Sequence, residues 1–184
     1  MILYYLIFVM PAVALVSALL YAPCYIHCRC TQGPRGAAFH LAKFALIGCL
    51  LSQLYLTSLC YWPDISFTQE YHFLNLQPFA WLTEGYTMGL PKTLFQVGAN
   101  IAMFVPLGFL LPVAAGRMRS FPKTALAVLA VTVSIETAQY FIGRSADIDD
   151  VIMNFLGGIL GYGLFALCRR LLRGCHWWLR MLEE

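Results

Sequence analysis

The stretch SIETAQYFIGRSADIDDVIMNFLGG, residues Ser134–Gly158, decides the fold because it places a short polar connection between two long apolar runs. The runs on either side, Phe121–Ile142 and Asp150–Leu172, are each long enough to cross a bilayer, which takes roughly 20 mostly apolar residues. Two spans joined by so short a polar connection predict an antiparallel pair of transmembrane helices, with the connection at one membrane face.

Three further apolar segments precede this pair: Ile2–Tyr21, Phe39–Tyr61 and Thr93–Ala115. The composition agrees with a membrane protein, since 60% of the residues are hydrophobic and 11% are charged, whereas soluble domains carry about 25% charged residues. We therefore predict an all-α, multipass bundle of about five transmembrane helices. The first segment is interpreted as a retained helix rather than a signal peptide, because no basic residue precedes its apolar run.

The basic residues predict the orientation of the bundle in the membrane. Of the 12 Lys and Arg residues, all but Lys92 and Arg144 fall on one side of a chain with five spans. Cytoplasmic loops are enriched in Lys and Arg. We therefore expect the N-terminus outside and the C-terminus inside the cell, with Ser134–Gly158 turning at the extracytoplasmic face.

Three cysteines and a histidine gather after the first span, in the stretch CYIHCRC, residues 24–30. Cys24, His27, Cys28 and Cys30 are residue types that bind zinc, but their spacing is not that of a standard pair of zinc knuckles. We predict no metal site here. Thiols on a cytoplasmic loop stay reduced, so ordinary juxtamembrane cysteines are the preferred interpretation.

The segment Trp62–Lys92 is the one long connection that we expect on the extracytoplasmic side. It is rich in aromatic residues, which favour the headgroup level of a bilayer, and it contains the turn-like element NLQPF, Asn75–Phe79. Two interpretations stay open: an interfacial plug with a turn, or a lid over a polar site, since loops of this length are often functional.

Polar side chains recur at helical spacing on the last three predicted spans. A face repeats every three or four residues of a helix, so Asn100, Glu136 and Asn154 are expected to meet at similar depth in the outer half of the bundle. An unpaired acid there costs about 2.5–3.5 kcal/mol, which makes Glu136 a candidate functional residue. The alternative is interhelical glue, in which Glu136 and Gln139 hydrogen-bond Asn154 and Asn100.

Three acids lie just before or at the start of the last predicted span: Asp147, Asp149 and Asp150. One Asp suffices to cap a helix N-terminus, so the cluster exceeds what capping requires. It could bind a divalent cation, hold Arg144 or engage a cationic ligand. Arg144 could instead bind a phosphate or carboxylate, although pairing with the cluster is the favoured resting state.

Taken in order, these motifs resemble the VanZ-like family of bacterial integral membrane proteins. The resemblance covers about Asn75 to Tyr162 and rests on NLQPF, on Asn100 with FVPLGF (Phe104–Phe109), and on the polar residues of Ser134–Gly158 with Gly157 and Gly161. It implies a multipass protein of the bacterial cell membrane. The family is named for an accessory protein of glycopeptide-resistance clusters that is associated with teicoplanin resistance.

The resemblance suggests a division of the chain into three parts. Residues 1–61 would form two transmembrane helices with a cysteine-rich cytoplasmic loop, residues 62–172 the VanZ-like domain, and residues 173–184 a cytoplasmic tail. The candidate ligand-binding residues all lie in the second part: Asn100, Glu136, Gln139, Arg144, Asp147, Asp149, Asp150 and Asn154.

The first functional hypothesis is a non-enzymatic protein that binds an envelope lipid or amphiphile at this polar site and lowers susceptibility to lipoglycopeptides such as teicoplanin. The alternative is an enzyme that modifies an envelope lipid or its headgroup, with Glu136 as general acid or base. A transporter is disfavoured, because no inverted repeat is visible. Expected partners are membrane lipids, with a lipid-linked precursor or an amphiphilic antibiotic as ligand. Oligomerisation and any cofactor stay open, and no basic run suggests nucleic acid.

Overall fold

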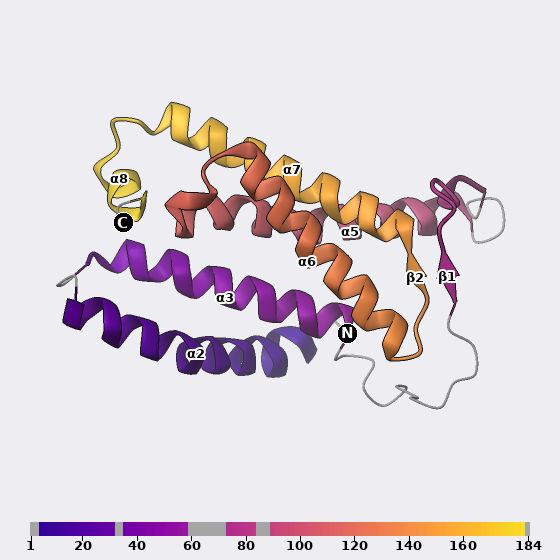
Figure 1. The fold of residues 1–184 in the computed structure, drawn as a ribbon, viewed down its shortest axis with the longest axis horizontal. Coiled ribbons are helices and arrows are strands. Elements are labelled where there is room, and N and C mark those ends of the chain that lie inside the picture. The colour runs from indigo at the N-terminus through magenta and orange to yellow at the C-terminus, as the bar shows by residue number, and fades with distance from the viewer. Residues whose placement is uncertain (1–3, 32–34, 59–72, 84–88, 183–184) are drawn as a thin grey trace.

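The protein is an elongated bundle of antiparallel helices (Figure 1). The computed structural model describes residues 4–31, 35–58, 73–83 and 89–182. Five helices in this part of the chain are long and apolar enough to cross a membrane. The elements are η1 (Tyr5–Val9), α2 (Met10–Thr31), α3 (Ala37–Thr57), β1 (Leu74–Asn75), α5 (Leu90–Ala114), η3 (Gly116–Met118), α6 (Phe121–Phe141), β2 (Ala146–Asp147), α7 (Ile148–Leu171) and α8 (His176–Leu182).

The predicted all-α multipass fold is confirmed, and four of the five spans begin and end within a few residues of their predicted bounds. The first span differs, because it runs over Ile7–Thr31 rather than Ile2–Tyr21. Cys24, Cys28 and Cys30 therefore lie on the last turns of α2 and not in a loop. Pro23 did not end the helix as proline often does, since α2 continues through it.

Helices α5 and α7 approach each other closely along a row of glycines. A Cβ atom at Gly108 would collide with the carbonyl oxygen of Gly158, and one at Gly161 would collide with the carbonyl oxygen of Val105. Backbones that meet at this distance leave no room for a side chain, which is how small residues favour helix association in lipid. Gly157 belongs to the same row, since a Cβ atom there would collide with the carbonyl oxygen of Ile101.

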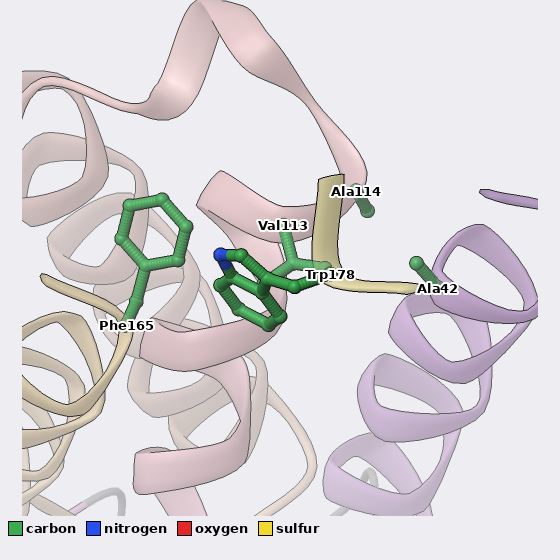
Figure 2. Close-up of a cluster of buried hydrophobic side chains, with 5 residues drawn as sticks. All are labelled: Ala42, Val113, Ala114, Phe165 and Trp178. Carbon is green, nitrogen blue, oxygen red and sulfur yellow. The ribbon is translucent and has the colours of Figure 1, made fainter. Parts of the chain in front are cut away.

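Two clusters of buried apolar side chains hold the remaining helices to this pair. Phe104, Leu107, Val128 and Ile135 join α5 to α6 in the middle of the bundle. Figure 2 shows the second cluster, in which Trp178 of α8 lies between Phe165 of α7 and Val113 of α5, with Ala42 of α3 nearby. The short C-terminal helix therefore folds back against the bundle.

The two ends of the bundle differ in character (Figure 1). One end carries the end of α2, the start of α3, the short helix η3 and helix α8. It holds most of the basic residues and is called the basic end below. The opposite end carries β1 and β2, and is called the acidic end. Which end faces the cytoplasm stays a prediction from the basic residues.

We predict that Gly161→Ala destabilises the protein by about 1–3 kcal/mol, the usual range for forcing extra volume into a packed interior. The new methyl group must push α7 away from the backbone of α5. Thermal unfolding of the purified chain in detergent, followed by circular dichroism, measures the effect.

Gly163→Ala is the matched control, because Gly163 lies on the same helix and nothing lies within 4 Å of the position of its added Cβ. It should unfold at or above the wild-type temperature, since alanine favours a helix more than glycine does. Equal losses in the two variants would contradict the packing argument.

Candidate functional site

At the acidic end, the segment around NLQPF is tied to the start of α7 by two short strands. Leu74 pairs with Ala146 and Asn75 with Asp147 in parallel register, and the amide N–H of Ala146 donates to the carbonyl oxygen of Phe73 at 3.0 Å. β1 and β2 lie side by side at one end of the bundle (Figure 1). The loop segment is thus part of the site and not merely near it.

Asp149 holds the turn that follows β1. Its carboxylate accepts the amide N–H of Phe79 at 2.6 Å on one oxygen and that of Trp81 at 3.2 Å on the other. Phe79 has φ 64°, a left-handed conformation that is costly for a bulky residue. Because Asp149 is only 6% exposed, these two charge-assisted bonds are strong enough to hold the strained turn.

Asp147 performs the capping role that the sequence predicts for one of the acids. One of its carboxylate oxygens accepts the amide N–H of Asp149 at 2.8 Å, which caps α7. The other accepts the side-chain amide of Asn75 at 3.0 Å. The Asn75 oxygen in turn accepts the amide N–H of Gln77 at 3.0 Å. A single carboxylate therefore joins the helix start to the loop.

Glu136 lies on α6 and, like Asp149, is only 6% exposed. Its carboxylate accepts the amide N–H of Asp147 at 3.0 Å. The helix that carries Glu136, α6, is thereby linked to β2 across the turn of Ser134–Gly158. Asp150 lies at the other side of β2, where one carboxylate oxygen accepts the side-chain amide of Asn100 on α5 at 2.5 Å.

Gln139 and Arg144 meet at the end of α3. The side-chain amide of Gln139 and the guanidinium of Arg144 both donate to the carbonyl oxygen of Thr57, at 3.0 and 2.6 Å. The last carbonyls of a helix have no partner within the helix, and here one donor from α6 and one from the α6–α7 connection satisfy the carbonyl of Thr57. Pairing of Arg144 with the acids stays a prediction.

Asn154 lies apart from the other site residues. Its side-chain amide donates to the hydroxyl of Thr132 on α6 at 3.2 Å. The predicted glue pairs of Glu136 and Gln139 with the two asparagines were wrong, because these side chains have other hydrogen-bond partners. That Asn100, Glu136 and Asn154 lie at similar depth stays a prediction. Equal depth along two helices does not fix which faces meet, and here the loop backbone occupies the space beside Glu136.

A small hollow of about 30 Å³ lies within this arrangement. Its walls include the carboxylates of Asp147, Asp149 and Asp150, together with Asn100 and Trp81. The indole N–H of Trp81 is buried and has no hydrogen-bond partner among the described residues. The hollow has room for a water molecule or a small polar group, and the three acids among its lining residues make it rich in hydrogen-bond acceptors.

Metal binding finds no geometric support in the described residues, where no three His, Cys, Asp or Glu side chains are grouped to hold an ion. This holds for the acids of the acidic end and for the cysteines of α2 alike. Instead, the carboxylates accept hydrogen bonds from backbone and side-chain N–H groups. Chemically, the site can accept hydrogen bonds from a small donor group at its surface.

Sequence reasoning missed Thr57 and Trp81 as parts of the site. Thr57 takes part through its backbone carbonyl, which any residue type supplies, so the only signal was its place at the end of a span. Trp81 lies in a loop rich in aromatic residues, and no spacing rule singles it out. Asn75 was noted only as part of NLQPF.

We predict that Asp149→Asn frees the segment 73–83 from the bundle. The asparagine side chain keeps one acceptor oxygen, but its NH₂ group faces one of the two backbone N–H groups of Phe79 and Trp81. Each charge-assisted hydrogen bond that is lost is worth about 1.5–3 kcal/mol. Hydrogen–deuterium exchange at Phe79 and Trp81 should become faster by about tenfold or more. Asn100→Ala is the control, since it removes only the hydrogen bond to Asp150. If exchange at Phe79 and Trp81 also becomes faster in that variant, Asp149 has no specific role in holding the segment.

Comparison with known proteins assigns the chain to a family. The sequence pattern of the family described as VanZ/LLP1 matches residues 42–169, which include most of α3 as well as the whole acidic end. The chain is also 38% identical over 72 residues to "Protein VanZ" from Enterococcus faecium; this match covers 39% of the chain and 44% of that relative. No solved structure matches the chain significantly. The protein therefore belongs to the VanZ/LLP1 family of multipass membrane proteins.

Proposed function

We propose that the protein binds an envelope lipid or amphiphile at the acidic end, and that this binding lowers susceptibility to lipoglycopeptide antibiotics such as teicoplanin. The observation that carries the proposal is the hollow beside Trp81, which combines carboxylate acceptors with a buried indole N–H that lacks a partner. Buried polar groups are rarely left without partners, so an unused donor in a polar hollow favours an incoming group.

The size and chemistry of the hollow define what part of a ligand enters it. A volume of about 30 Å³ admits a hydroxyl or an amino group but not the body of an amphiphile. A group that both donates and accepts fits best, because it would donate to Asp150 or its neighbours and accept from Trp81. The rest of the ligand would then lie outside the hollow, toward lipid or the aqueous phase.

The geometry favours binding over the alternative of an enzyme. Each acid of the cluster already accepts at least one hydrogen bond that holds a helix or the loop in place, as Glu136 does for Asp147 and Asp149 for Phe79. These bonds give the acids a structural role that suits a binding site, in which the same carboxylates can accept further hydrogen bonds from a ligand.

The link to lipoglycopeptides rests on the family and is tested in cells. Wild type, Glu136→Gln and Asp150→Asn would be expressed at matched levels in a susceptible Gram-positive host, and cell-bound fluorescent teicoplanin would be measured. We expect wild type to lower the bound antibiotic relative to empty vector. Both variants should lose the effect, because Asp150 lines the hollow and Glu136 holds the backbone of Asp147, another of its lining residues. A lost charge-assisted hydrogen bond reduces affinity by about tenfold or more.

Thr137→Val is the matched control for this experiment. Thr137 follows Glu136 on α6, is exposed, and its hydroxyl donates only to Val133 of its own helix at 2.7 Å. It should behave as wild type. If wild type and all variants bind as much teicoplanin as empty vector, the proposed role in lipoglycopeptide susceptibility is wrong for this protein.

A further inference from the structure

The basic end of the bundle carries a second hollow, which the proposed function does not use. It measures about 780 Å³ and lies where η3, the C-terminal part of α7 and helix α8 meet. Four arginines line it: Arg119, Arg169, Arg170 and Arg173. No Asp or Glu is among its lining residues in the part of the chain that the structure describes.

General preferences for basic residues do not account for this convergence. An excess of Lys and Arg at a cytoplasmic end needs no common location, and Arg117 and Lys123 are exposed at the same end without lining the hollow. Arg169 and Arg170 lie in the last turn of α7, where they suit the negative end of the helix dipole. Arg119 and Arg173 lie outside that turn, so the helix dipole does not explain their positions.

Two residues that line the hollow also carry buried donors that the described residues leave unused. The Nε atom of Arg119 and the indole nitrogen of Trp178 are buried and have no hydrogen-bond partner among the described residues. Trp178 is only 2% exposed, and in Figure 2 its indole nitrogen lies on the side of the ring that faces Phe165, another residue of the hollow. Such unpaired buried donors are rare and are costly to maintain.

The position of Arg119 is fixed by neighbouring groups. Its guanidinium donates to the carbonyl oxygen of Leu182, and its own carbonyl oxygen accepts the hydroxyl of Tyr162 at 2.9 Å. One edge of the guanidinium is thus anchored to α8 while Nε stays unpaired. A fixed guanidinium loses less conformational entropy when it binds an anion, which favours binding.

We propose that this hollow binds the phosphate-bearing headgroup of an anionic membrane lipid. Guanidinium groups bind phosphate oxygens through paired N–H donors, and several guanidinium groups around one hollow suit a headgroup with more than one phosphate charge. The volume of about 780 Å³ exceeds what a single phosphate fills and lies in the range of small-molecule sites.

The location of the hollow favours a lipid over a soluble anion. Arg169 and Arg170 end the membrane-spanning helix α7, so their guanidinium groups lie near the headgroup level. Phe165 and Leu179 add apolar surface to the same walls. A soluble phosphate has no use for apolar walls, whereas the first carbons of an acyl chain do.

Binding of fluorescent cardiolipin, a lipid with two phosphates, to the purified full chain in neutral detergent tests the proposal. Cardiolipin should bind more tightly than phosphatidylglycerol, and phosphatidylcholine should compete weakly. The double variant Arg169→Gln/Arg173→Gln should bind cardiolipin about tenfold more weakly or worse, because each lost charge-assisted contact contributes that much. Trp178→Phe, which keeps the ring but removes the N–H, should weaken binding by a smaller factor.

The charge-matched control is Arg117→Gln/Lys123→Gln, which removes two positive charges from the same end but none from the hollow. Its affinity should stay within about twofold of wild type, since exposed charges at a distance are screened. Equal weakening in the two double variants would overturn the proposal, and so would equal binding of cardiolipin and phosphatidylcholine.

Two further arms separate the lipid from other anions. Inorganic diphosphate should fail to displace cardiolipin at equal concentration. Diphosphate binding that depends on Arg169 and Arg173, without lipid binding, would overturn the lipid assignment.

Glu183 and Glu184 lie next to Leu182 in the sequence, outside the described residues. Changing both to Gln should leave cardiolipin affinity equal or stronger, and a loss of affinity would also contradict the proposal.

Discussion

The acidic end depends on the carboxylate of Asp149 and the two backbone N–H groups that it accepts. Backbone donors close to a bilayer must be satisfied by the protein, because little water is available to do so. The turn at Phe79 has no ladder or helix to use its N–H groups, and Asp149 supplies the acceptors instead. This pair of bonds brings a loop segment into register with β2 and closes the end of the bundle.

The other polar residues extend the same kind of contact to each neighbouring helix. Glu136 holds the backbone of Asp147, Asn100 holds Asp150, and Gln139 with Arg144 holds the carbonyl of Thr57. The glycine contact between α5 and α7 fixes the distance at which Asn100 and Asp150 meet. Stability and binding are therefore not separate properties of this end, since the groups that shape the hollow also hold the helices together.

The sequence predicted the spans well because a run of apolar residues is long compared with the uncertainty of its ends. The candidate site residues stay a prediction, and helical spacing did not predict their hydrogen-bond partners, as Asn154 and Thr132 show. Helical spacing reports the face of one helix, whereas partners depend on how two helices rotate against each other. The contacts to Phe79 and Thr57 were beyond sequence reasoning, because they use backbone atoms that every residue possesses.

The contrast between the two ends is the reason to regard them as sites of different kinds. At the acidic end, charged and amide groups largely satisfy one another, so a ligand can add only a small group beside Trp81. At the basic end, four guanidinium groups converge without an acid among the described lining residues. Arg169, Arg170 and Arg173 are exposed and Arg119 is half-buried, so an anion from outside the described chain can reach these guanidinium groups, which suit phosphate oxygens. A membrane lipid is the anion that is always present at that level.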